Sequence, residues 1–318
     1  MVSNVFSPMI ASSDSSQILP AVYIVGAGPG DPELLTVKAL KLIQQADVLV
    51  YANSLVPAQI LSAIRPNAEK IATANMTLED IVPLMVERVR EGKSVVRLHS
   101  GDPSLYSAIH EQMLRLSEAD VPFEVIPGIS AFQAAAARLN VELTVPEQVQ
   151  SIILTRISGR TRVPDAEELA GLAAHKASLC LYLSARHVED SQAQLLEHYS
   201  PETPVAICFR VGWPDERIWV APLAQMAAIT ARENLVRTTL YIVSAALRVE
   251  TTQAAEEQEV RQVRSRLYNP THDHLFRPKH TEPAFTKSVM GDKAEGSDKL
   301  SRTNVSAGVR REREQGKR

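Results

Sequence analysis

The amino-acid sequence predicts two successive α/β domains, and three observations support this fold class. First, short apolar runs rich in Val, Ile and Leu alternate with helix-like segments between residues 21 and about 140, which is the pattern of a mainly parallel sheet covered by helices. Second, another series of such runs begins after the segment LTVPE at 143–147. Third, 45% of the 318 residues are hydrophobic, enough to fill two cores.

The predicted first domain opens with the run AVYIV at 21–25, whose β-branched and aromatic residues are typical of a buried parallel strand. A Gly-rich turn and the helix-like stretch LLTVKALKLIQQA follow this strand. The segment TLEDIVPLMVERVREG is predicted to be a helix with Thr77 as its N-cap and Gly92 as its stop. The remaining strands of this domain are expected at 48–51, 94–99 and 123–127.

The predicted second domain contains three helical segments, AEELAGLAAH, HVEDSQAQLLEHY and LAQMAAITA. They separate strands expected at 151–156, 178–183, 204–209, 217–221 and 239–247. Apolar periodicity stops after Val249, and the polar, Pro-containing remainder is predicted to be disordered because it cannot bury enough surface. The expected organisation is therefore a flexible leader at 1–20, α/β domains at 21–140 and 141–249, and a charged tail at 250–318.

Charge and cysteine content bear on the partners and the cellular compartment of the protein. The formal net charge is −3, but residues 251–318 carry 14 Lys and Arg against 10 Asp and Glu, so the rest of the chain is acidic. This balance gives no indication of a nucleic-acid partner. The two cysteines, Cys180 and Cys208, lie in apolar runs and are expected to be buried thiols in a reducing, cytoplasmic compartment. Neither a signal peptide nor a membrane-spanning run is found, so no membrane association is expected.

The Gly-rich segment GAGPGD at 26–31 lies between a predicted strand and a predicted helix. It is similar to a dinucleotide-binding turn, but Pro29 and Pro32 remove amide donors that a phosphate would use. The acidic residue at the expected spacing, Asp47, precedes the second strand, whereas a ribose-binding acid would follow it. A plain tight turn and a loop lining a ligand cleft both remain open for this segment.

Two further Gly-containing loops follow predicted strands. In SGDPSLYSA at 100–108, Asp102 is either an acceptor for a ligand or a cap for the next helix. In PGISAFQAAAA at 127–137, Ser130 is a plausible N-cap and the Ala run permits close packing. Because ligands bind at the carboxyl ends of parallel strands, three such loops indicate a shared crevice more strongly than any one of them does.

These three loops resemble the three signatures of the tetrapyrrole methylase family. The resemblance continues, in order from about 21 to 247, through DVLVYANSLVP, RLHSGDPSLYSAIHEQ, LTVPEQVQSIILTRISGRTRVP, LYLSARHVED and FRVGWPDERIW. Two positions depart from the family pattern, because Asn53 and Ser107 stand where glycine is expected.

The resemblance implies two α/β domains with the cofactor, S-adenosylmethionine, in the cleft between them, and a homodimeric assembly. It implies methylation of precorrin-4, or of cobalt-precorrin-4, at C-11 during cobalamin biosynthesis. The cofactor contacts that it places on this chain are Pro29, Ser100, Gly101, Asp102, Leu105, Ser130, Ala131, Leu183 and Val211. Apolar walls with a few polar anchors suit a methionine moiety and an adenine.

The implied chemistry is direct displacement at an already activated methyl group, so we expect no metal and assign no general base. Tyr106 and His99 flank the cofactor loop and are the two side chains that we would test as catalytic residues, although packed or solvent-facing roles suit them equally. A polycarboxylate substrate requires local positive charge. The candidates for substrate binding are Arg156, Arg160, Arg186 and Arg210, which lie at or after strands of the second domain.

Three alternatives remain open at this stage. The chain could act on another ring position as a different precorrin or uroporphyrinogen methyltransferase of the same family. It could instead be a nicotinamide-dependent oxidoreductase, against which the two prolines and the position of Asp47 argue. A non-enzymatic tetrapyrrole carrier would lack a candidate axial ligand and would leave the Gly-containing loops unexplained.

Overall fold

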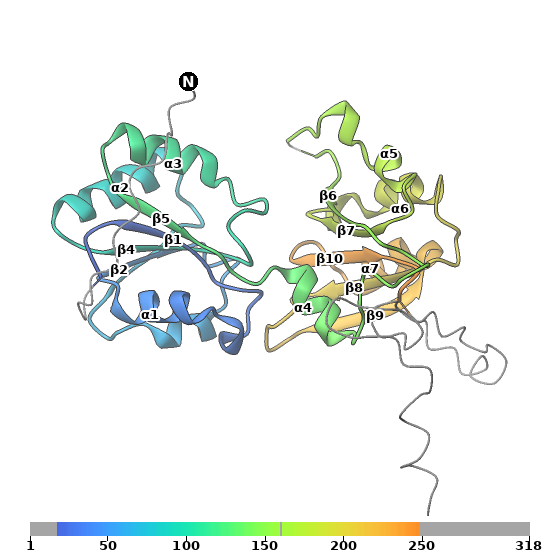
Figure 1. Cartoon of the computed structure of the whole chain (residues 1–318), viewed down its shortest axis with the longest axis horizontal. Helices are drawn as coiled ribbons and strands as arrows, with labels where there is room; N and C mark the ends of the chain where they lie inside the picture. Colours follow the sequence, from blue (N-terminus) through green and yellow to red (C-terminus); the bar gives the residue numbers. More distant parts are fainter. Residues whose placement is uncertain (1–17, 160, 248–318) are drawn as a thin grey trace, which may run out of the picture. The chain divides into compact units, whose positions relative to one another are not determined.

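The computed structural model describes residues 18–159 and 161–247, which form ten strands arranged as two five-stranded sheets with helices around them (Figure 1). The α/β class expected from the sequence is therefore confirmed. The expected leader at 1–17, Arg160 and the expected tail from 248 onward lie outside the described residues. Within the described part of the chain, no helix combines the length and apolar character needed to cross a membrane.

The first sheet is entirely parallel and has the strand order β3-β2-β4-β1-β5. Four of its strands lie where the apolar runs predict them, at Val22–Gly26 (β1), Val48–Tyr51 (β2), Val95–His99 (β4) and Phe123–Ile126 (β5). The fifth, β3 at Glu69–Ala72, was not predicted. Its sequence EKIA alternates between partly exposed and exposed residues at the edge of the sheet, so it has no buried apolar run.

Helices cover both faces of the first sheet. Helix α1 (Val37–Gln45) packs on the face that presents Tyr23, Val25 and Leu49. Helices α2 (Leu78–Arg90) and α3 (Ile109–Glu118) pack on the opposite face. The adjacent strands β1 and β4 therefore lead into helices on opposite faces, which is the topological switch point where ligands bind in open parallel sheets.

Local sequence explains where the first-domain helices begin. Thr77 and Asp80 form the capping box of α2, and the helix ends at Arg90, two residues before Gly92, as predicted. The predicted helix from Leu34 starts later, because a short 3-10 turn occupies Pro32–Leu34. Helix α1 begins only after Thr36, whose Oγ1 accepts a hydrogen bond from the amide of Ala39.

The second sheet has the order β6-β7-β10-β8-β9 and is mixed rather than parallel. Only β6 and β7 pair in parallel, and the pairs β7–β10, β10–β8 and β8–β9 are antiparallel. The strands are Ile152–Arg156 (β6), Ser178–Tyr182 (β7), Pro204–Phe209 (β8), Arg217–Pro222 (β9) and Thr239–Val243 (β10). Because β10 is inserted antiparallel between β7 and β8, the strands β6, β7 and β8 still run in one direction and end at one edge.

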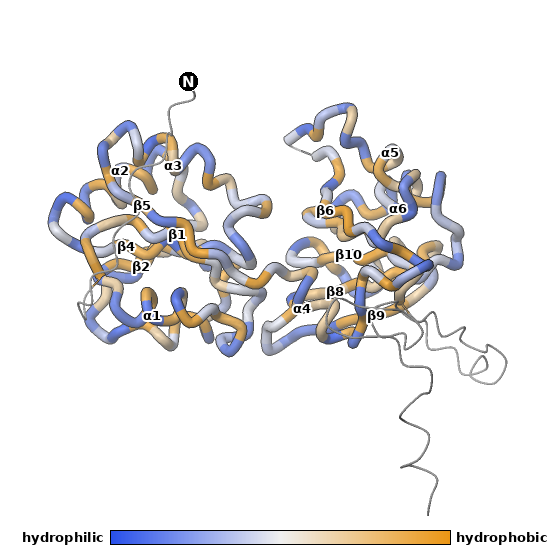
Figure 2. Tube along the Cα trace, in the orientation of Figure 1, coloured by the Kyte–Doolittle hydropathy of each residue, from blue (hydrophilic) through white to orange (hydrophobic). Residues whose placement is uncertain are grey.

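Two apolar layers enclose this sheet, one on each face. Figure 2 shows that the central strands of both sheets are mostly hydrophobic. Helices α5 (Leu169–Ala173), α6 (Val188–Leu196) and α7 (Met226–Arg232) pack on one face. Helix α4 (Ala131–Arg138) packs on the other face through Ala134 and Ala135, although it directly follows β5 of the first sheet. The domain boundary expected at residue 140 stays a prediction. It assigns α4 to the first domain, although α4 packs on the second sheet.

Cys180 and Cys208 are buried, as predicted, and both are free thiols. They lie in the apolar layer on the face of the sheet that α4 covers. Burial raises the pKa of the Cys180 thiol to about 12 and raises that of Cys208 as well. Both residues therefore act as small apolar side chains.

Candidate functional site

The three Gly-containing loops meet at the carboxyl ends of β1, β4 and β5. Gly28 and Gly101 exchange two backbone hydrogen bonds, with N···O distances of 3.2 and 2.7 Å. A Cβ atom added to Gly128 would lie 2.3 Å from the carbonyl oxygen of Gly101 and 2.8 Å from the Cα of Gly26. Gly26 and Gly128 approach this closely because neither residue has a side chain. The three loops therefore meet at one end of the sheet, and a ligand crevice between them stays a prediction.

Asp102 joins the second loop to the third. Its Oδ1 accepts hydrogen bonds from the amide (2.8 Å) and the hydroxyl of Ser104, and its Oδ2 accepts one from the amide of Gly128 (2.8 Å). Burial acts to raise the pKa of this carboxyl, but the hydrogen bonds from Ser104 and Gly128 outweigh it and hold the pKa below its usual value. Asp102 is therefore ionised at neutral pH, and it caps a local turn as well as fixing the loops.

The third loop contacts the end of strand β7. Ser130, the N-cap of α4, lies with its Oγ 2.9 Å from the hydroxyl of Tyr182, which also accepts from the amide of Phe132 at 3.3 Å. The ring of Tyr106 lies 5.3 Å from that of Tyr182, centroid to centroid. The second and third loops of the first sheet are thereby joined to the residue that precedes Leu183.

Leu183 has two unusual properties. The residue is 67% exposed although its side chain is large and apolar, and its backbone lies in the left-handed region with φ of 54°. Tyr106 and Ala108 share that backbone conformation, on either side of Ser107. Strained residues of this kind persist where the surrounding structure holds them, often at ligand sites. An exposed leucine beside the polar loops suits the predicted apolar wall of a cofactor site.

A set of contacts that the sequence did not predict holds the first loop against residues 210–216; we call it the clasp. The side-chain amide nitrogen of Gln59 (Nε2) donates to the carbonyl oxygens of Gly30 (2.6 Å) and Gly212 (2.9 Å). Arg138 pairs with Asp31 (3.6 Å) and Glu216 (3.3 Å).

Trp213 completes the clasp by lying directly on Gly30. A Cβ added to Gly30 would be 2.6 Å from Cδ1 of the indole ring. The guanidinium of Arg210 lies 4.9 Å from the same ring and pairs with Asp215 at 2.5 Å. The clasp brings Pro29 of the first loop close to the segment that contains Val211, and both residues are buried.

The predicted substrate arginines differ in their surroundings. Arg156 donates to the carbonyl oxygens of Thr161 (2.7 Å) and Arg162 (3.1 Å), so it orders the loop after β6. Arg210 is engaged by Asp215 and two aromatic rings, whereas Arg186 is exposed. Arg160 lies outside the described residues.

The two catalytic candidates are placed differently. Tyr106 is 42% exposed, and burial acts first to raise the pKa of its phenol, so it is protonated at neutral pH. His99 is 8% exposed at the end of β4, and its Nε2 has no hydrogen-bond partner among the described residues. Burial and the charge of Arg97 lower the pKa of His99 to about 3. His99 is therefore neutral, and neither residue is suited to accept a proton at neutral pH.

The low pKa of His99 predicts an acid-dependent loss of stability. Unfolded chains bind a proton at histidine below about pH 6.5, whereas folded His99 does so only near pH 3, so stability is fully present above pH 6.5 and decreases as the pH falls through this window. We expect His99→Gln to reduce the pH slope of the unfolding free energy by about 1.4 kcal/mol per pH unit between pH 6 and 4. Urea titrations at several pH values measure this slope, and the exposed His175→Gln serves as control. An unchanged slope in His99→Gln would contradict the assignment.

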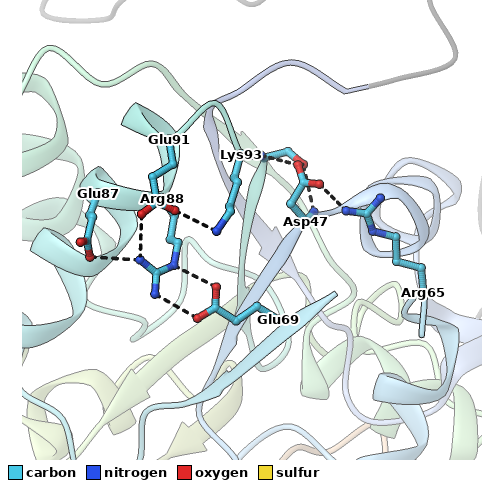
Figure 3. Close-up of polar contacts among 8 residues, drawn as sticks. Asp47, Arg65, Glu69, Glu87, Arg88, Glu91 and Lys93 are labelled. Carbon is cyan, nitrogen blue, oxygen red and sulfur yellow. Dashed lines mark hydrogen bonds and ion pairs between the residues drawn. The ribbon is translucent and has the colours of Figure 1, made fainter. Parts of the chain in front are cut away.

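Asp47, which the dinucleotide alternative would require at a ribose, is engaged elsewhere. It accepts hydrogen bonds from the amide (2.8 Å) and the hydroxyl (2.7 Å) of Ser94. It also pairs with Arg65, as Figure 3 shows. Among the described residues, no cluster of three His, Cys, Asp or Glu side chains is arranged to hold a metal ion.

Comparison with known proteins agrees with this geometry. Residues 21–227 match the family described as "Tetrapyrrole (Corrin/Porphyrin) Methylases". The chain is 42% identical over 260 residues to the cobalt-precorrin-4 C(11)-methyltransferase of Methanocaldococcus jannaschii, covering 81% of this chain and 96% of that protein. It is 42% identical over 257 residues to the precorrin-4 C(11)-methyltransferase of Pseudomonas aeruginosa, covering 81% of this chain and 98% of that protein.

Two solved structures are also similar. The X-ray structure of a cobalt precorrin-4 methyltransferase of cobalamin biosynthesis has a TM-score of 0.70 and 40% identity, covering 76% of this chain and 100% of the other. The uroporphyrin-III C-methyltransferase of Thermus thermophilus, solved with S-adenosylhomocysteine, has a TM-score of 0.60 and 29% identity, covering 71% of this chain and 98% of the other.

Proposed function

Because the chain belongs to the tetrapyrrole methylase family, we propose that it transfers the methyl group of S-adenosylmethionine to C-11 of precorrin-4 or cobalt-precorrin-4 in cobalamin biosynthesis. The single observation that carries this proposal is the 42% identity, over most of both chains, to enzymes named for that reaction. The nicotinamide alternative is disfavoured, because Asp47 is bound by Ser94 and Arg65.

The residues present fit the cofactor. The loops that meet at Gly26, Gly101 and Gly128 carry the ionised Asp102, and Leu183 supplies an exposed apolar surface. We propose that the predicted contacts, Pro29, Ser100, Gly101, Asp102, Leu105, Ser130, Ala131, Leu183 and Val211, hold it there. When bound, S-adenosylmethionine supplies an activated methyl group on a sulfonium.

The protein's part in this reaction is orientation. A carbon of the electron-rich tetrapyrrole forms the new bond to the methyl group as the methyl–sulfur bond breaks, and S-adenosylhomocysteine leaves. The loops of the first sheet and the residues at the ends of β7 and β8 fix the reacting partners, which lowers the entropic part of the barrier. Exposed Arg186 and the loop ordered by Arg156 supply positive charge for the substrate's carboxylates.

One experiment tests the proposed reaction. The purified protein is incubated with S-adenosylmethionine and either precorrin-4 or its cobalt form, and the position of the new methyl group is located by NMR. Methylation at C-11 is expected. Methylation at another ring carbon would instead support a different methyltransferase of the family, and tight binding of NADH without S-adenosylhomocysteine binding would support the oxidoreductase.

Asp102 allows a direct test of the cofactor site. Asp102→Ala removes the acceptor for the amide of Gly128 and for Ser104, so the second and third loops lose their connection. We expect the affinity for S-adenosylhomocysteine to fall by roughly ten- to a hundred-fold, as for a lost hydrogen bond to a charged group of about 1–3 kcal/mol. Isothermal titration calorimetry measures the change. The control is Asp80→Ala, which also removes a locally bonded carboxylate but lies in the cap of α2; equal losses in both variants would argue against the site.

We further propose that the enzyme is a cytoplasmic homodimer. Two buried free thiols suit a reducing compartment, and the family resemblance implies the dimer. Light scattering coupled to size-exclusion chromatography tests the assembly, for which a mass near 70 kDa is expected from the 34.9 kDa chain; a mass near that of one chain would contradict it.

A further inference from the structure

Arg97 is a buried cation that has no counter-charge among the residues that the structure describes. The residue is only 7% exposed. Within residues 18–159 and 161–247, no carboxylate lies within ion-pair distance of its guanidinium. Its one hydrogen bond within the described chain runs from Nη1 to Oγ1 of Thr73, at 3.0 Å, and its Nε has no partner there. Arginine stays charged in proteins, so this arrangement is costly unless an anion balances it.

Two other arginines, Arg88 in α2 and Arg65 before β3, show what pairing with a carboxylate looks like. Figure 3 shows Arg88 making a two-pronged contact with Glu69, at 2.9 and 3.1 Å, with Glu87 and Glu91 also within reach. In the same view Arg65 pairs with Asp47. Arg88 and Arg65 thus have carboxylate partners supplied by the chain itself. Arg97, the most buried of the three, has none among the described residues.

The position of Arg97 points to a ligand at the edge of the sheet. Arg97 belongs to β4, the strand that ends in the Ser100–Asp102 loop. Its guanidinium reaches Thr73, the residue directly after β3, whose amide donates to the carbonyl oxygen of Tyr51 at the end of β2. The cation therefore extends across the carboxyl ends of β2 and β3, the edge at which parallel sheets bind ligands.

The missing partner is best supplied by a carboxylate. It must accept from Nε and the remaining N–H groups of Arg97, and it must carry a negative charge, which a water molecule does not. Carboxylates match the planar fork of a guanidinium. The precorrin substrates of the proposed reaction carry carboxylate arms around the ring, and the substrate must lie near the loop that follows β4.

We propose that Arg97, with Thr73 beside it, binds one carboxylate arm of the tetrapyrrole substrate at the carboxyl edge of the first sheet. This inference rests on the proposed function for the identity of the substrate. The binding site itself does not depend on it, because a simple carboxylate tests it without turnover. Arg97 would add a contact from the first sheet to the arginines predicted on the second.

The test compares Arg97→Met with Arg97→Lys and with the paired Arg88→Met. For Arg97→Met we expect the KM for cobalt-precorrin-4 to rise roughly ten-fold or more, with kcat and the S-adenosylhomocysteine Kd within two-fold of wild type. Arg97→Lys keeps the charge without the fork and should give an intermediate KM. Arg88→Met should leave the KM unchanged, because Glu69 rather than a ligand partners Arg88.

Thermal unfolding with added sodium propionate provides the second readout, with sodium chloride at equal ionic strength as reference. Propionate should raise the midpoint of the wild type but not that of Arg97→Met, and in its absence Arg97→Met should unfold no earlier than wild type because it lacks the uncompensated charge. The proposal is overturned if the KM of Arg97→Met stays within two-fold of wild type, if its S-adenosylhomocysteine Kd rises in parallel, or if propionate stabilises both proteins equally. Failure of the wild type to methylate precorrin-4, with a specific propionate effect retained, would overturn the proposed reaction and leave the carboxylate site.

Discussion

Replacing Gly128 with alanine is expected to abolish measurable binding of S-adenosylhomocysteine. The added methyl group would lie 2.3 Å from the carbonyl oxygen of Gly101 and within 3.0 Å of two backbone atoms of Gly26. All of these contacts involve backbone, which cannot rotate away as a flexible side chain could. The three loops would have to separate, and the predicted cofactor contacts on the second and third loops would move with them.

The same change should also destabilise the fold. Forcing a methyl group into a close-packed site costs about 3 kcal/mol, so the thermal midpoint should fall by roughly 6–12 °C. Calorimetric titration and thermal unfolding measure the two effects. The control is Gly171→Ala in α5, where an added Cβ meets no atom within 4 Å. That variant should bind normally, and normal cofactor affinity in Gly128→Ala would mean that the loop junction does not form the site.

Trp213→Ala is expected to weaken cofactor binding by about ten-fold, although Trp213 is not among the predicted cofactor contacts. The substitution removes the indole that covers Gly30 and the ring over which Arg210 lies. Among the described residues, the polar contacts left between the first loop and residues 210–216 would then be those of Gln59 and Arg138. Looser holding of Pro29 and Val211 raises the entropy that the cofactor must remove on binding.

Trp219→Ala is the matched control for this prediction. Trp219 also lies against an arginine, Arg217, at 5.3 Å, but it belongs to β9 and takes no part in the clasp. The Trp219→Ala variant should be less stable than the wild type, while its cofactor affinity should stay within two-fold of the wild-type value. The chain contains two tryptophans, so Trp219→Phe leaves Trp213 as the single tryptophan. The fluorescence of Trp213 in this variant should change when S-adenosylhomocysteine is added. Unaltered emission at saturating ligand would show that the clasp is not coupled to the site.

The sequence predicted the strands with buried apolar runs and the three loops that follow them, because both signals are local. It did not predict β3, whose four residues include two charged side chains at a sheet edge. Strand direction in the second sheet was also inaccessible, since an apolar run such as TLYIV fits a parallel or an antiparallel neighbour equally well.

The clasp was missed for a different reason. Gln59, Arg138 and Trp213 are far apart in the sequence, and none lies in a pattern that predicts contact with the first loop. Family resemblance placed Pro29 and Val211 in one site, but not the residues that hold their segments together. The sequence analysis did not single out Arg97, because only its burial and its lack of a carboxylate partner among the described residues set it apart.

The reversed direction of β10 has a practical consequence for attaching the enzyme to a support. Val243, the last residue of β10, pairs with Leu179 near the start of β7, and the hydroxyl of Ser244 lies 2.7 Å from that of Ser178. The described chain thus leaves the second sheet at the edge opposite to Arg156, Leu183 and Val211, which follow or end β6, β7 and β8. Immobilisation through a linker that replaces the residues after Leu247 would therefore start from the face remote from these groups, and surface-bound enzyme should retain its cofactor affinity.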